Sequence, residues 1–151
     1  LEDVKNILAK AASSTTKLVL PVDVVIAQEP AEGAETRVVK PEDIPPDYMG
    51  LDIGPETVAL FKSYIKDAKL VFWNGPLGLF EIPAFAQGTL GIADELARTD
   101  AFTIIGGGDV VAAVNQMGYA DKMGFISTGG GASIEFMEGK PLPGVVALDD
   151  K

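Results

Sequence analysis

The segment Phe102–Val114 constrains the fold of this chain more than any other part of the sequence. It reads Phe-Thr-Ile-Ile-Gly-Gly-Gly-Asp-Val-Val-Ala-Ala-Val, which is a short apolar run, three glycines, an aspartate and an Ala/Val-rich segment. This order predicts a strand, a turn and a helix. Glycines leave the backbone uncovered, and the helix that follows directs its positive end at the same point. The segment therefore predicts an anion site, for which phosphate is the natural ligand.

Asp109 follows these glycines and has two interpretations. It can cap the helix that starts there, or it can hold a divalent metal ion that is bound to a nucleotide phosphate. The segment by itself leaves both interpretations open.

Composition excludes several classes of function. The chain has 151 residues, of which 47% are hydrophobic, so it can form one domain with a substantial core. Its net charge of -10 opposes non-specific attraction to nucleic acid or to anionic lipid. Cysteine and histidine are both absent, which excludes disulfides, thiolate metal sites and a Ser-His-Asp triad. Because no long apolar run and no secretory signal occur, we expect a soluble, cytoplasmic protein without a membrane partner.

The apolar pattern alternates between strands and helices along the chain. Helices are predicted over residues 2–12, 55–68, 84–98, 109–117 and 130–138. Strands are predicted over residues 18–27, 36–39, 70–74, 102–106 and 124–127. Residues 48–57 read as a turn leading into a helix, and residues 144–148 as a closing extended piece. Pro21 must interrupt the first strand or lie at its edge.

This alternation predicts an α/β fold in which a parallel sheet carries helices on both faces, a three-layer Rossmann-like arrangement. We expect a four-stranded parallel core. The loops at the carboxyl ends of such strands line one common edge, and three of them are rich in glycine or polar residues: 74–81, 106–109 and 128–131. The site is expected at that edge.

A second glycine turn, Gly129–Gly131, raises the expectation of anion binding, because two helix N-termini then converge on one edge. No Gly-Lys-Ser/Thr follows either turn, so neither is a Walker loop. Asn74, directly after a strand, can offer its amide to a phosphate. Glu81 is either a solvated loop acid or an acceptor for ribose hydroxyls. Trp73 is expected in the core.

Three runs of sequence resemble the carboxyl-terminal motifs of phosphoglycerate kinase. They are Trp-Asn-Gly-Pro-Leu-Gly-Leu-Phe-Glu (73–81), Ile-Ile-Gly-Gly-Gly-Asp (104–109) and Ser-Thr-Gly-Gly-Gly-Ala-Ser-Ile-Glu (127–135), in the family's order and spacing. Residues 20–25, 49–55 and 138–145 are similar to the same family, so the resemblance covers practically the whole chain.

The resemblance implies an ATP/ADP site in a glycolytic kinase that transfers a phosphoryl group between 1,3-bisphosphoglycerate and ADP. It implies that the adenine and ribose lie against Gly50, Leu51, Pro76 and Leu79. It places Glu81 on the ribose hydroxyls, Asn74 on the phosphate chain and Asp109 at the Mg²⁺ site. It also implies that the two glycine turns surround the transferred phosphoryl group, through Gly106, Gly107, Gly108, Gly129, Gly130 and Gly131.

The chain departs from the family pattern in two ways. Val110 stands where the family usually has Ser or Thr, whose hydroxyl contacts a nucleotide phosphate; the backbone N–H remains, so we expect a weakened contact. The amino-terminal domain, with its 3-phosphoglycerate pocket, and the Gly-Gly-Ala-Lys segment are also missing. We therefore expect residues 1–151 to be an inactive piece of the carboxyl-terminal nucleotide-binding domain. The parent is expected to be a monomer, and the piece to associate with itself through an exposed sheet edge or an exposed apolar face.

Two other functions compete with the kinase. One is a non-catalytic nucleotide- or phosphate-binding module of the same fold. The other is a dinucleotide-dependent dehydrogenase domain, but the chain lacks Gly-x-Gly-x-x-Gly followed by an acidic residue about twenty positions later.

Overall fold

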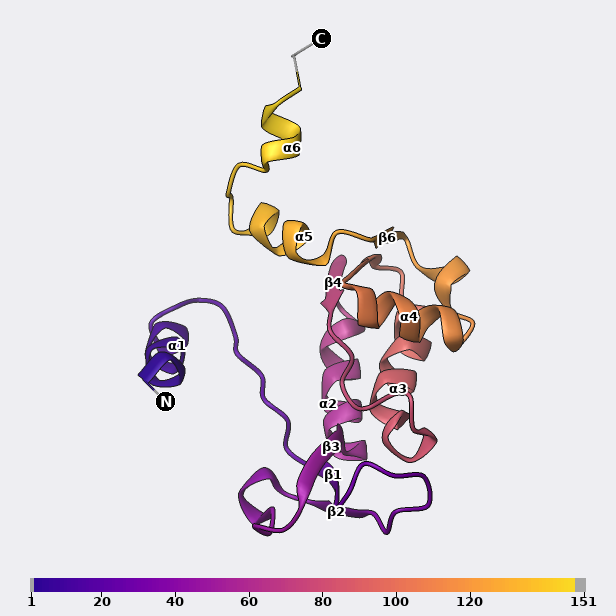
Figure 1. The fold of residues 1–151 in the computed structure, drawn as a ribbon. Helices are drawn as coiled ribbons and strands as arrows, with labels where there is room; N and C mark the ends of the chain where they lie inside the picture. The colour runs from indigo at the N-terminus through magenta and orange to yellow at the C-terminus, as the bar shows by residue number, and fades with distance from the viewer. Residues whose placement is uncertain (1, 149–151) are drawn as a thin grey trace.

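A computed structural model describes residues 2–148, in which helices and strands alternate along most of the chain (Figure 1). The helices are α1 (Glu2–Ala12), α2 (Pro55–Ile65), α3 (Gln87–Leu96), α4 (Gly108–Gln116), α5 (Gly130–Met137) and α6 (Pro143–Val146). The strands are β1 (Val24–Ala27), β2 (Arg37–Val39), β3 (Met49–Ile53), β4 (Leu70–Asn74), β5 (Phe102–Gly106) and β6 (Phe125–Ser127). In this part of the chain, no helix is both long enough and apolar enough to span a membrane.

Two three-stranded sheets organise these elements. The parallel sheet has the order β4-β5-β6, with Trp73 paired to Ile105 and Ile105 paired to Ile126. The second sheet has the order β2-β1-β3 and is antiparallel throughout. The α/β class with a parallel sheet and helices is confirmed.

The prediction of a fourth parallel strand at residues 18–27 is wrong. Only β1 forms a strand there, and it runs antiparallel to β2 and β3, with Val24 opposite both Val39 and Ile53. A continuous apolar run indicates burial on both faces of a strand, but it does not indicate the direction of the partner strand. Leu18 and Leu20 precede the strand without regular secondary structure and are exposed.

Two shorter segments also differ from expectation. Residues 49–53, predicted as part of a turn, form β3, in which Gly50 pairs with Ile26 next to a bulge in the register. Residues 144–148, predicted to be extended, include α6, which begins at Pro143, where the fixed φ of proline suits the first helical turn. In both segments, nearby glycine and proline residues made the weak preference for a strand or a helix hard to recognise from the sequence.

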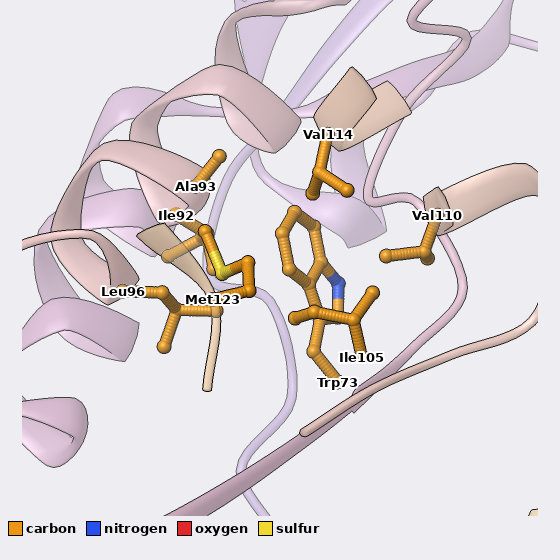
Figure 2. Close-up of a cluster of buried hydrophobic side chains, with 8 residues drawn as sticks. All are labelled: Trp73, Ile92, Ala93, Leu96, Ile105, Val110, Val114 and Met123. Carbon is orange, nitrogen blue, oxygen red and sulfur yellow. The ribbon is translucent and has the colours of Figure 1, made fainter. Parts of the chain in front are cut away.

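The main core lies between the parallel sheet and helices α3 and α4 (Figure 2). Trp73 and Ile105 are register partners and face the same side of the sheet, and Ile92, Leu96 and the α4 valines surround them. The Trp73 indole N–H donates to the Gly75 carbonyl oxygen at 2.8 Å, so its polar atom is satisfied. Trp73 is a core residue, as expected.

The opposite face of the parallel sheet is only partly covered. Phe72 and Ile104, which alternate with the core residues along their strands, line an apolar groove together with Phe136 and Met137 of α5. Helix α5 therefore borders this face, whereas α3 and α4 cover the other. In Figure 1, α1 and α6 stand away from this central body.

Two buried aspartates cap helices that are distant in sequence. Asp23 accepts hydrogen bonds from the backbone N–H groups of Glu56 (3.0 Å) and Thr57 (2.7 Å), and so caps α2, whose own N-cap, Gly54, has no side chain. Asp52 accepts from the N–H of Gly88 at 2.7 Å, and so caps α3, whose N-cap Ala86 makes no side-chain bond. Asp23, directly before β1, and Asp52, in β3, thus each connect a strand region to a helix more than thirty residues away.

The two carboxyl groups differ in pKa. Burial raises the pKa of Asp23, but hydrogen bonds from the Thr57 hydroxyl and from the backbone of Glu56 and Thr57 outweigh burial, so that its pKa is lowered overall. Burial dominates at Asp52 and raises its pKa to about 6, despite opposing hydrogen bonds from the backbone of Gly88 and Ile53.

A pH dependence follows from this difference. The raised pKa of Asp52 gives a stabilising contribution that is complete below its unfolded pKa and is lost as pH rises through about 6. We expect the free-energy cost of Asp52→Asn to be larger at pH 5 than at pH 7.5, by about 1 kcal/mol. Urea unfolding of both chains at both pH values measures this.

Asp23→Asn is the matched control, because the pKa of Asp23 is lowered and its carboxylate stays charged between pH 5 and 7.5. Its free-energy cost is expected to be the same at both pH values. An equal cost of Asp52→Asn at the two pH values would contradict the assignment for Asp52.

Candidate functional site

A cavity of about 370 Å³ opens at the carboxyl ends of the parallel strands, where the sequence predicts the site. We call it the glycine-turn cavity. It is lined by Asn74, Gly75, Gly107, Gly108, Asp109, Val110, Gly130, Gly131 and Ile134. Neighbouring strands bring the two turns together, because Asn74 is the register partner of Gly106, and Gly106 is the partner of Ser127.

The two glycine turns touch each other and Asn74. A Cβ at Gly130 would lie 2.7 Å from the Gly107 Cα, and a Cβ at Gly107 would lie 2.7 Å from the Asn74 Oδ1. Gly107 also has φ +95°, in the region that side chains disfavour. Side chains at these positions would therefore separate the turns.

The N-termini of α4 and α5 both face this cavity without a side-chain cap. In α4, the Val111 N–H donates a hydrogen bond to the carbonyl oxygen of the N-cap residue Gly107 at 3.0 Å. In α5, the Ser133 N–H donates to the carbonyl oxygen of the N-cap residue Gly129 at 2.8 Å. The N–H groups of residues 108–110 and 130–132 precede these donors and have no partner within their own helix. No lysine or arginine is among the lining residues, so an anion here would meet backbone dipoles.

Asp109 is an exposed residue in the first turn of α4 and lines the glycine-turn cavity. The N-cap of α4 is Gly107, so the interpretation of Asp109 as the residue that caps this helix is wrong. Within residues 2–148, no group of three acidic, cysteine or histidine side chains is placed to hold a metal ion. A single carboxylate fits Mg²⁺ that takes its other ligands from phosphates and water.

A second cavity, of about 450 Å³, lies beside the first and has a more apolar lining. We call it the β3-loop cavity. Its lining residues are Val24, Gly50, Leu51, Asp52, Ile53, Pro76, Leu77, Gly78 and Leu79. The Leu79 N–H donates to the Leu51 carbonyl oxygen at 2.9 Å, which joins the loop to β3. Asn74 and Gly75 line the first cavity, and the residues that follow them, 76–79, line the second, so the two cavities adjoin along this loop.

Most of the predicted residues therefore lie in one of two adjoining cavities. The β3-loop cavity contains all four residues that the resemblance places against adenine and ribose, namely Gly50, Leu51, Pro76 and Leu79. Three lie elsewhere: Glu81 is exposed and outside both linings, Gly106 is buried at the end of β5, and Gly129 borders the apolar groove beside α5.

The side chain of Val110 is completely buried and belongs to the core cluster with Trp73 and Val114. It therefore contributes packing to the core, while its backbone N–H lies in the first turn of α4. This explains how an apolar residue is accommodated at that position.

Sequence reasoning missed Asp52 as part of the site. Asp52 lines the β3-loop cavity while its carboxylate caps α3. In the sequence, an aspartate between the apolar residues Leu51 and Ile53 is the signal that could have identified it. This signal was missed because residues 48–57 were predicted as a turn.

The comparisons with known proteins agree on one family. The family profile described as "Phosphoglycerate kinase" matches residues 1–140. The phosphoglycerate kinase of Clostridium novyi is 56% identical over 153 residues, covering 100% of this chain and 38% of that protein. The enzyme of Fusobacterium nucleatum is 57% identical over 154 residues, covering 100% of this chain and 39% of that protein.

Solved structures give the same result. The structure of phosphoglycerate kinase from Coxiella burnetii matches with a TM-score of 0.90 at 39% identity, over 96% of this chain and 38% of that one. The enzyme from Pyrococcus horikoshii matches with a TM-score of 0.82 at 28% identity, over 97% of this chain and 36% of that one. The chain thus spans between a third and two fifths of the length of these relatives, and it belongs to the phosphoglycerate kinase family.

Proposed function

We propose that the two adjoining cavities form the ATP/ADP-binding part of a phosphoglycerate kinase, and that residues 1–151 belong to its carboxyl-terminal nucleotide-binding domain. One observation carries the proposal: the contact between two glycine turns points the uncapped N-termini of α4 and α5 into one cavity. Backbone amides at helix N-termini are suited to phosphate oxygens.

The shapes of the cavities suggest the orientation of the nucleotide. The apolar β3-loop cavity suits the adenine and ribose, between Gly50 and Leu51 on one side and Pro76 and Leu79 on the other. The phosphates then extend along residues 74–79 to Asn74 and the glycine turns. Glu81, just beyond this loop, is the residue we propose for the ribose hydroxyls.

We propose that the parent enzyme transfers a phosphoryl group between 1,3-bisphosphoglycerate and ADP in the cytoplasm. Such transfer depends on positioning and on neutralising charge on the phosphoryl oxygens. Gly107, Gly108, Gly130 and Gly131 offer backbone amides without side chains that would block approach. Mg²⁺, held through Asp109 and the nucleotide phosphates, would neutralise further charge.

Phosphate binding is tested by Gly130→Ala. The added Cβ would lie 2.7 Å from the Gly107 Cα, so the two turns must move apart and their amides no longer converge. We expect the affinity for pyrophosphate, measured by calorimetry, to fall by about tenfold or more. Gly144→Ala is the matched control, because a Cβ there has no neighbour within 4 Å and lies in α6; its affinity should equal that of the unaltered chain. Equal affinities for all three chains would contradict the phosphate site.

The metal role is tested by Asp109→Ala. We expect weaker binding of ADP in saturating Mg²⁺, by about five- to tenfold, and little change without Mg²⁺. Asp121→Ala, at an exposed position outside both cavities, is the control. An unchanged affinity at saturating Mg²⁺ would remove Asp109 from the metal role.

We expect no phosphoryl transfer by the 151-residue chain alone. Neither cavity has a lysine or arginine in its lining, and phosphoryl transfer needs cationic groups around the transferred phosphoryl, so we propose that residues of the parent enzyme outside 1–151 supply the side-chain cations. A coupled assay that detects turnover by the purified chain would refute this. Nucleotide binding without turnover is also the behaviour of a non-catalytic module, so a longer parent chain with kinase activity is needed to separate these two functions.

A further inference from the structure

Asp52 is buried at the point where β3, the 76–79 loop and the N-terminus of α3 meet, at the edge of the β3-loop cavity. Its side chain lies next to the end of β3 and is 4% exposed. One carboxylate oxygen accepts from the Gly88 N–H at 2.7 Å, and the other accepts from the Ile53 N–H at 2.8 Å. The same carboxylate therefore holds β3 and the first turn of α3.

The loop that forms the other wall of the cavity packs directly on this carboxylate. A Cβ at Gly78 would overlap the Asp52 carboxylate and the Phe85 carbonyl oxygen. A Cβ at Gly88 would overlap the carboxylate from the helix side. Glycine at both positions is what lets the loop and α3 close around a charged group.

Hydrogen bonds on both sides of Gly78 hold the loop in this place. The Leu77 N–H donates to the Thr89 hydroxyl at 3.0 Å, and Thr89 belongs to the first turn of α3. The Leu79 N–H donates to the Leu51 carbonyl oxygen at 2.9 Å, next to Asp52 in β3. A change at Asp52 therefore reaches the loop through both of its anchoring elements.

We propose that Asp52 is a positioning residue that sets the width of the β3-loop cavity, by fixing β3, the 76–79 loop and the N-terminus of α3 to one another. The ligand of this cavity, the adenosine end of a nucleotide, comes from the proposed function, and in that respect this inference rests on it. Asp52 does not need to touch the nucleotide. It acts through Leu51, Gly78 and Leu79.

A carboxylate suits this role better than an amide. Both oxygens of Asp52 accept a backbone N–H, whereas an asparagine has one acceptor oxygen and would direct an NH₂ group at one of the two donors. Asp52→Asn thus keeps the shape of the side chain and removes one of the two hydrogen bonds. Asp23→Asn makes the same change at the cap of α2, at a residue outside the cavity lining.

The experiment compares the full chain with these two variants by three measurements. They are amide hydrogen exchange at Gly88 and Leu79, affinity for MgADP, and affinity for pyrophosphate. For Asp52→Asn we expect exchange at both amides to accelerate, and MgADP to bind about fivefold or more weakly. Affinity for pyrophosphate should stay unchanged, because the phosphate end lies in the glycine-turn cavity. For Asp23→Asn all three should remain as in the unaltered chain.

The measurements separate failure of this inference from failure of the proposed function. If the unaltered chain does not bind MgADP, the proposed function fails, and the exchange rates alone decide the role of Asp52. Unchanged exchange at Gly88 and Leu79, or equal loss of MgADP and pyrophosphate affinity, overturns the inference. If Asp52→Asn does not fold, Gly78→Ala displaces the loop from the same carboxylate and should give the same selective loss of MgADP affinity.

Discussion

The contact between the two glycine turns is the constraint on which the candidate site depends. Gly130 approaches the backbone of Gly107 so closely that a single added carbon would lie 2.7 Å from its Cα. Parallel pairing of β5 with β6 fixes this approach, since Gly106 and Ser127 are register partners at the strand ends. The helices that follow inherit their directions from the turns, and therefore point their amides into one cavity.

The charge of the chain makes this geometry necessary for anion binding. With a net charge of -10 and no lysine or arginine lining either cavity, local attraction for phosphate must come from helix N-termini and backbone N–H groups. At two other helices, buried aspartates already accept hydrogen bonds from the N-terminal N–H groups. Asp23 and Asp52 satisfy the N-termini of α2 and α3, whereas α4 and α5 are left without side-chain caps.

Prediction from the sequence succeeded where a motif has only one physical solution. A β-branched run ending in Gly-Gly-Gly-Asp predicted β5 and α4, and Trp73 was correctly expected in the core. It failed at β1 and β3, because an apolar run does not specify the direction of its partner strand, and because Gly50 resembles a turn residue until its pairing with Ile26 is known. Partners in a sheet are selected by contacts that are remote in sequence.

The sequence by itself determined the α/β class, the family to which the motifs belong and the sheet edge at which we propose the site, because glycine turns and strand ends are local features. Only the tertiary structure divided the predicted residues between two cavities, placed Glu81 outside both linings and directed Val110 into the core. It alone revealed Asp52, whose bond to the Gly88 N–H spans 36 residues. Which helix a carboxylate caps depends on how the chain packs, and no local pattern encodes that choice.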